Sequence, residues 1–261
     1  PNVLTENIEE GVLVDSGGTV VISGLTAQRN NQEGLEILAN TDQGKVTLTS
    51  LNLQYNDNLG VSVTARGSIK LDRVTSDFND GGALLDNTTA ATDQPISILR
   101  STFNANFLYG FTAQSKGNLL VNGVSANGSL LFGGELLNNA GSGTVTIASS
   151  YGPNRFNGNG SVGLSINSSG AVTISKLMAS GNGLGFADSG LKVTTSGQPV
   201  TITCGIFNGN GKSGIRATLG AGVLTLKGVT ALGNDLGGGA IDPDIFSATA
   251  PVILPASCGT W

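Results

Sequence analysis

The sequence of 261 residues contains no histidine, and this absence excludes several kinds of catalytic site. Without an imidazole there is no Ser-His or Cys-His nucleophile pair, no histidine-ligated zinc and no histidine acting as general base. The two cysteines, Cys204 and Cys258, are too few for a four-cysteine zinc or iron–sulfur centre. We therefore expect no metal site of these kinds and no cofactor.

Charged residues are also scarce. They make up 12% of the chain, and the net charge is −5. Nucleic acids and anionic membrane surfaces attract clusters of Lys and Arg, so the lack of any such cluster argues against both partners. No run of about 18 or more apolar residues is present, and we expect no membrane span.

The sequence is rich in glycine, and many of its 40 glycines belong to a repeat. A five-residue frame recurs ten times, 23 to 28 residues apart: a small or turn residue, any residue, then apolar, free and apolar positions. One copy is GTVTI from Gly143, and the last is APVIL from Ala250. Such a period is typical of a solenoid with one strand-bearing coil per repeat. We expect one elongated domain because the repeat is unbroken.

The frame predicts which side chains face the interior. Residues two apart in a strand point to the same side, so Val145 and Ile147 are expected to face inward. The last copy places Val252 and Leu254 in the same inward positions. A second inward segment follows three positions later, and a third follows a glycine. Three short strands per coil with no helical pattern predict an all-β solenoid of parallel sheets, with about ten coils.

The chain divides into three parts by this pattern. Residues 1–17 lack the frame, and we interpret them as an N-terminal cap or an imperfect first coil. Residues 18–250 form the solenoid. Residues 251–261 hold the final strand and a C-terminal tail or cap, because the terminal coil of a solenoid otherwise exposes its interior and its unpaired backbone groups.

An asparagine recurs in the turn between the second and third strands of most coils. Stacked amides bond to one another and to turn backbone, and asparagine tolerates the left-handed conformation of such a bend. The alternative to this structural role is that the row of asparagines binds a ligand or metal ions. The residues of the predicted structural ladder are Asn30, Asn56, Asn79, Asn106, Asn159, Asn182, Asn210 and Asn234.

The strands of the GxVTI type, the turn Asn208-Gly209-Asn210-Gly211 and the following Gly-Leu/Ile-x-Val/Ile strand resemble the repeats of right-handed single-stranded parallel β-helices. That group includes pectate lyases, polygalacturonases, phage tailspikes and large secreted bacterial surface proteins and adhesins. The resemblance implies the fold and is poorly specific for function. The Gly/Asn/Thr-rich texture is more similar to the surface proteins.

Three aspartates form a candidate catalytic set. Asp57 and Asp80 occupy the same position on adjacent coils, and Asp77 lies three residues before Asp80. Stacked carboxylates about 5 Å apart can hold Ca²⁺ or share a proton as an acid–base pair. This set would suit a polysaccharide lyase or hydrolase acting on acidic glycans. The simpler interpretation is that turns favour Asp and Asn.

Aromatic residues offer a further alternative, a carbohydrate-binding module without chemistry. Tyr55, Phe78, Phe107 and Tyr109 would form its platform if they are exposed, and Tyr55 and Phe78 would equally suit a stack in the core.

We expect a non-enzymatic extracellular rod, secreted or at the cell surface, that serves as a structural, filament-forming or adhesin module. Its partners would be further copies arranged end to end, surface glycans or other surface proteins. Whether Cys204 and Cys258 pair stays open. Two coils separate them by about 10 Å, beyond the reach of a disulfide unless the tail folds back.

Overall fold

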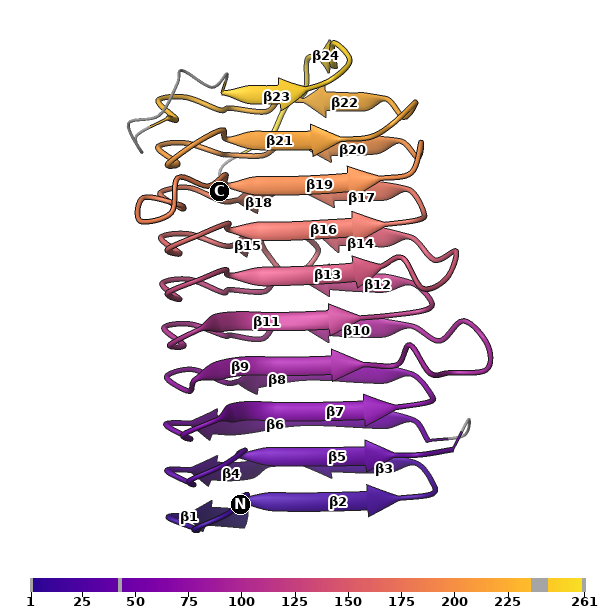
Figure 1. Cartoon of the computed structure of the whole chain (residues 1–261), viewed down its shortest axis with the longest axis vertical. Helices are drawn as coiled ribbons and strands as arrows, with labels where there is room; N and C mark the ends of the chain where they lie inside the picture. The colour runs from indigo at the N-terminus through magenta and orange to yellow at the C-terminus, as the bar shows by residue number, and fades with distance from the viewer. Residues whose placement is uncertain (1, 42–43, 236–243, 260–261) are drawn as a thin grey trace.

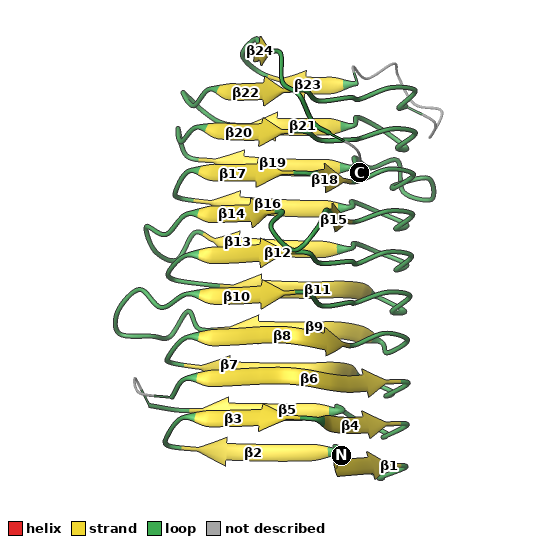
Figure 2. Cartoon of the chain, turned by 180° about the vertical axis from the view of Figure 1, so that it is seen from behind, coloured by secondary structure: helices red, strands yellow, loops and turns green. Residues whose placement is uncertain are grey.

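A computed structural model shows the chain as a rod of parallel β-strands, and it describes residues 2–41, 44–235 and 244–259. The strands cross the front of the rod from left to right in both views as the chain climbs, which is the sense of a right-handed coil (Figures 1 and 2). The rod has about nine turns. The predicted all-β parallel β-helix is confirmed. The described residues include no helix that could cross a membrane.

Two long parallel sheets face each other across the interior. The first, sheet A, contains the strands of the predicted frame, together with β1 and β4 from the second segment of the coil. Its neighbouring strands in order are β1 (Asn2–Thr5), β4 (Leu25–Gln28), β6 (Val46–Gln54), β8 (Ile69–Thr75), β10 (Ile96–Leu99), β12 (Leu119–Asn122), β14 (Val145–Ala148), β17 (Val172–Ser175), β20 (Val200–Thr203), β22 (Leu224–Lys227) and β24 (Val252–Leu254). Strand β3 (Val20–Ser23) also pairs with β6.

The second sheet, sheet B, corresponds to the predicted third strand of each coil. Its strands in order are β2 (Val12–Ser16), β5 (Leu35–Ala39), β7 (Leu59–Ala65), β9 (Gly81–Asp86), β11 (Tyr109–Gln114), β13 (Gly134–Asn138), β16 (Leu164–Ser168), β19 (Leu191–Thr195), β21 (Ile215–Thr218) and β23 (Ile245–Ser247). A two-stranded sheet joins β15 (Asn154–Arg155) and β18 (Leu177–Met178).

The predicted second strand is less regular than the other two. It continues β6 and β8, it forms β4, β15 and β18, and elsewhere it is reduced to isolated bridges such as Thr102 to Ser125. Left-handed bends limit it on both sides, for example at Gly123 (φ 68°) and Gly128 (φ 70°). Few residues remain between the two bends, so the ladder is short.

Residues 1–17 supply the first two strands. β1 pairs in parallel with β4 and β2 with β5, so this segment continues both sheets. Val3 and Leu13 are exposed on its outer side, and no further strand among the described residues covers that edge.

The last copy of the frame departs from its predicted orientation. The prediction that Val252 and Leu254 face inward is wrong, since both are exposed. β24 pairs with β22 so that Ile253, not Leu254, lies opposite Leu226. A shift of one residue exchanges the two faces of a strand, and among the described residues β24 has no strand on its other side.

The interior is a continuous apolar column. Val145 and Ile147 are buried, as are their counterparts in the central coils, and each buried aliphatic side chain contributes about 1.5–3 kcal/mol. Four phenylalanines are also buried: Phe103, Phe111, Phe156 and Phe207. Three of them contact one another through tilted rings, with centroids 5.1 Å and 6.0 Å apart.

The asparagines predicted as a ladder form directed hydrogen bonds along the rod. In the pair Asn182 to Asn210, the backbone amide and Nδ2 of Asn182 donate to Oδ1 of Asn210 at 2.9 and 3.1 Å. The same pattern links Asn30 to Asn56 and the coils beyond, except at Ser129, whose hydroxyl is buried without a partner. The ladder residues are Asn7, Asn30, Asn56, Asn79 and Asn106, then Asn159, Asn182, Asn210, Asn234 and Asp244.

A column of glycines packs against this asparagine ladder. An added Cβ on Gly163 would lie 2.6 Å from the carbonyl oxygen of Gly190 and 2.7 Å from Nδ2 of Asn182. Gly34 and Gly214 meet the equivalent asparagines at 2.7 and 2.9 Å. The glycine at or near the start of most strands of sheet B therefore makes room for the ladder.

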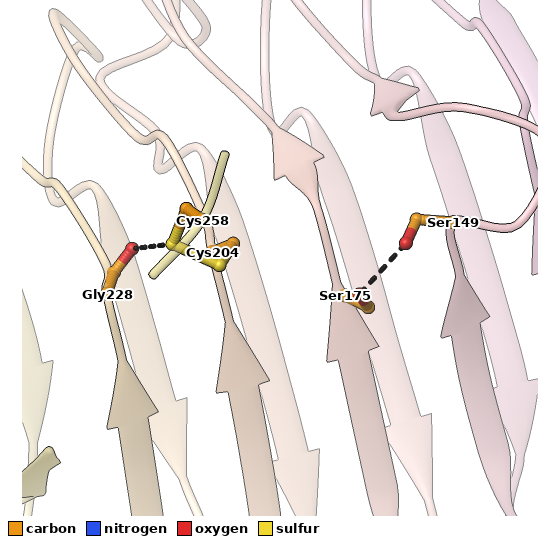
Figure 3. Close-up of a disulfide and its surroundings, with 5 residues drawn as sticks. All are labelled: Ser149, Ser175, Cys204, Gly228 and Cys258. Atoms are coloured by element: carbon orange, nitrogen blue, oxygen red, sulfur yellow. Dashed lines mark hydrogen bonds between the residues drawn. A yellow bond between two sulfur atoms is a disulfide. The ribbon is translucent and has the colours of Figure 1, made fainter. Parts of the chain in front are cut away.

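Cys204 and Cys258 form a disulfide with their Cα atoms 5.3 Å apart (Figure 3). The C-terminal tail folds back over the last coil to reach Cys204, and this closes the distance that separates the two coils. Gly228 lies beside the disulfide, with its carbonyl oxygen 3.4 Å from Cys258 Sγ. A side chain at Gly228 would collide with that sulfur, because its Cβ would lie 2.5 Å away.

Candidate functional site

The candidate site lies on the edge of the rod where the chain turns from sheet A into sheet B. In each coil the residue before the ladder asparagine has left-handed backbone. Later coils place glycine there, for example Gly158 and Gly181, whereas the earlier coils place Glu6, Arg29, Tyr55 (φ 58°), Phe78 (φ 60°) and Ala105. This conformation costs a non-glycine residue roughly 1–2 kcal/mol. Aromatic residues kept at strained turn positions point to a role for their side chains.

Tyr55 and Phe78 stack on each other across adjacent coils. Their ring centroids are 5.1 Å apart, the planes differ by 5°, and each side chain is 48% exposed. Arg29 holds the same position on the preceding coil, and its guanidinium lies 5.9 Å from the centroid of the Tyr55 ring. On the following coil the same column holds only Ala105, whose methyl group is too small to cover the Phe78 ring.

A shallow hollow of about 600 Å³ opens beside this pair. Its walls include Tyr55, Phe78 and Phe107, with Asp57 and Asp80 between them. Phe107 is 62% exposed and continues the apolar wall onto the next coil. Aromatic surface joined to a few polar groups in a concave site is the usual composition of a ligand-binding site.

The structure brings two of the three candidate aspartates into this hollow. The backbone amides of Asp57 and Asp80 donate to carbonyl oxygens of Asn30 and Asn58, at 2.9 and 3.0 Å, which fixes both turns. Both side chains are exposed. Within the described part of the chain neither carboxylate takes part in a side-chain hydrogen bond or an ion pair, so both are available to a ligand.

Asp77 does not line the hollow. Its Oδ1 accepts a hydrogen bond from the backbone amide of Asn104 at 2.6 Å, and its Oδ2 accepts one from the Thr102 hydroxyl at 3.3 Å. Burial raises the pKa of this carboxyl, while the hydrogen bonds partly offset the rise. Both carboxylate oxygens already accept hydrogen bonds from residues of the next coil, which suits a structural role better than a catalytic one.

Asp77 is the first member of a second ladder, two residues ahead of the predicted one. Here the amide of each later coil donates to the side chain of the coil before it, opposite to the direction of the first ladder. The members after Asp77 are Asn104, Asn127, Asn157, Ser180 and Asn208. Its signal in the sequence is a polar residue two positions before the first ladder.

Tyr109, the fourth residue of the predicted platform, lies farther along the same edge. It stacks on Phe132 with centroids 5.2 Å apart and is only partly exposed. Burial raises the pKa of the Tyr109 hydroxyl, and the charges of Glu135 and Glu33 raise it further. Tyr109 is therefore part of an acidic neighbourhood beside the hollow.

Three glutamates gather near the N-terminal end of this edge. Carboxylate oxygens of Glu10, Glu33 and Glu36 lie within 4.8 Å of one another. Burial raises the pKa of Glu33, with smaller contributions from Glu36 and Glu10, and Asn58 Nδ2 donates to Glu33 Oε1 at 2.7 Å. Sequence reasoning missed this group because Glu10 lies in residues 1–17, which lack the frame that aligns one coil with the next. The absence of a metal site stays a prediction.

No protein-family model matches the chain, and no curated protein does. Among solved structures, the chain is similar to the A-module of the Azotobacter vinelandii mannuronan C-5 epimerase AlgE6. The match has a TM-score of 0.55 and 14% sequence identity, and it covers 98% of this chain and 80% of that one. At this identity the likeness shows the fold, a parallel β-helix.

Proposed function

We propose that this chain binds glycans along the edge that carries Tyr55 and Phe78. The observation that carries the proposal is the exposed stack of two aromatic rings at left-handed positions, where glycine would relieve the backbone strain. Nothing in the coil requires these rings, because later coils close with Gly158 or Gly181 at the same place.

The chemistry of the hollow suits a sugar. The apolar C–H face of a pyranose packs on an aromatic ring, and its hydroxyl groups need acceptors at the ring's margin. Asp57 and Asp80 supply four carboxylate oxygens there. A hydrogen bond to a charged group contributes about 1.5–3 kcal/mol, so two such contacts together with one stacked ring support specific binding.

The fold neighbour supports the same choice. That protein is a mannuronan C-5 epimerase, and mannuronan is a glycan, which favours a carbohydrate-related function over a purely structural rod. We further propose a secreted or surface-exposed location. The Cys204–Cys258 disulfide supports it, because disulfides persist in oxidising compartments.

Glycan affinity electrophoresis and a printed glycan panel test the binding. Tyr55→Ala and Phe78→Ala should each weaken retention at least tenfold while the protein stays folded. The matched control is Tyr151→Ala, because Tyr151 is 51% exposed and packs on Arg100 away from the hollow. Equal losses in all three variants, or no retention of the unaltered protein by any glycan, would refute the proposal.

Catalysis at Asp57 and Asp80 is the second candidate function, favoured by their position in one hollow on adjacent coils. Incubation with polyuronates and neutral polysaccharides, followed by assay for new reducing ends and unsaturated products, tests it. Cleavage that disappears in Asp57→Asn and Asp80→Asn, with binding retained, would establish an enzyme. A lack of any product would leave binding as the function.

A further inference from the structure

The two charged residues that line the hollow are both acidic. Among its lining residues Asp57 and Asp80 carry negative charge, and no Lys or Arg lines it. The nearest guanidinium on the aromatic column, that of Arg29, lies over Tyr55. A ligand that enters the hollow therefore meets carboxylates and aromatic rings.

The negative charge extends beyond the hollow along the same edge. Asn58, next to Asp57 in the chain, donates to Glu33, which groups with Glu10 and Glu36. Partly buried walls and charges of one sign strengthen the local field, and such a field concentrates ligands of opposite charge. The chain as a whole also carries a net charge of −5.

Aromatic rings and carboxylates together bind cations better than either does alone. An ammonium is attracted to the face of an aromatic ring and forms strong charge-assisted hydrogen bonds with carboxylates. The Phe78 face that Ala105 leaves uncovered can take a sugar ring. Asp57 and Asp80 lie two residues beyond the rings in their turns, beside the margin of that sugar.

We propose that the hollow selects glycans with free amino groups, that is hexosamine polymers without N-acetylation, over neutral and uronic-acid glycans. This inference rests on the glycan-binding function proposed above. The ammonium of the sugar would pair with Asp57 and Asp80 while its ring stacks on Phe78. A uronate would bring a like charge to the same carboxylates, which is unfavourable.

The shape of the edge favours a chain of sugars over a single sugar. Phe107 and Leu130 hold equivalent exposed positions on neighbouring coils, and the Phe186 ring reaches over Gly160 on the coil after them. A row of apolar side chains thus runs along the rod axis from the hollow. At about 4.8 Å per coil it extends roughly 20 Å from Phe78, so affinity should rise with oligomer length.

The test compares three oligomers of equal length by calorimetry at low and high salt: glucosamine, N-acetylglucosamine and a uronic acid. We expect the glucosamine oligomer to bind on the order of tenfold more tightly than the acetylated one and the uronate weakest, with the advantage shrinking as salt rises. The double variant Asp57→Asn/Asp80→Asn should lose the advantage and still bind the acetylated oligomer.

The controls distinguish the selectivity for amino sugars from glycan binding itself. Asp15→Asn/Asp93→Asn removes the same charge from exposed sites outside the hollow and should keep the preference for the amine. Equal binding of the acetylated and deacetylated oligomers would overturn the selectivity and leave glycan binding intact. Failure of every oligomer to bind would overturn both. Amine binding that survives Tyr55→Ala/Phe78→Ala would also refute the inference, since charge alone would then explain it.

Discussion

The backbone amide of Asn104 donates to Asp77 Oδ1 at 2.6 Å, and this bond starts a ladder that runs against the direction of the neighbouring asparagine ladder. In one ladder the amides point toward later coils, as from Asn182 to Asn210, and in the other toward earlier ones. The two ladders each contain a carboxylate, Asp244 in the first and Asp77 in the second, at the end that only accepts.

Asp77→Asn should leave the fold intact and flatten the pH dependence of stability. Burial raises the pKa of Asp77 in the folded state. Its contribution to stability is therefore full below the ordinary aspartate pKa and is lost as pH rises through the raised value. Urea unfolding from pH 3 to 7 should show the variant gaining stability relative to the native protein as pH rises. Asp80→Asn, which removes the same charge from an exposed position three residues further on, is the control. A loss of stability in Asp77→Asn at neutral pH would contradict this account.

Ser129→Asn should repair the gap in the first ladder. Ser129 stands where other coils place asparagine, and its buried hydroxyl has no partner. An asparagine there would offer Oδ1 to the amide groups of Asn106. We expect the free energy of unfolding to rise by about 1 kcal/mol, the usual net contribution of a hydrogen bond. Chemical denaturation measures it, and an unchanged or lowered midpoint would show that the turn at residue 129 cannot accept the larger side chain.

Gly163→Ala should destabilise the rod by about 1–3 kcal/mol or more, because the added Cβ meets a backbone carbonyl and the Asn182 amide. Gly185→Ala is the matched control, since its nearest atom would be 3.9 Å away. Thermal unfolding of the two variants should separate them clearly. Equal melting temperatures would mean that the asparagine ladder can move aside at little cost.

Replacing Cys204 and Cys258 with alanine should release the C-terminal tail. The disulfide closes a loop of 54 residues, for which loop entropy predicts a contribution of about 4 kcal/mol. Because each coil contacts only its neighbours, we expect the loss near the end of the rod. Hydrogen exchange should speed up in β22 and β24 and stay slow in β14. Faster exchange throughout the rod would indicate that the coils unfold as one cooperative unit.

The repeat made the fold predictable. A frame with apolar residues two apart fixes which side chains face inward, and Val145 and Ile147 are buried accordingly. The frame failed at the end of the chain, where Val252 and Leu254 match the pattern but lie exposed. A pattern of alternate residues does not specify register in a strand whose two faces are both exposed, as they are at Val252, Ile253 and Leu254.

The candidate site was predictable only in part. The repeat spacing places Asp57 and Asp80 at equivalent positions on adjacent coils, and the structure shows them in one hollow. The spacing also led to the prediction that Asp77 belongs to this set, because distance along the chain does not tell which way a turn side chain points. Asn7 escaped notice since residues 1–17 lack the frame by which coils were aligned. Left-handed backbone at Tyr55 and Phe78 is likewise invisible in the sequence, because this turn position holds glycine in only half of the coils.

Because its hydrogen bonds all run in one direction, the asparagine ladder also allows an additional coil to be inserted in the interior of the rod. Away from the gap at Ser129, each interior ladder asparagine accepts from the coil before it and donates to the coil after it, so a duplicated coil finds both partners already present. A second copy of residues 46–68 would add about 4.8 Å of length and place another tyrosine ring in the stack. The same coil added beyond Asp244 would meet a carboxylate that has no proton to give.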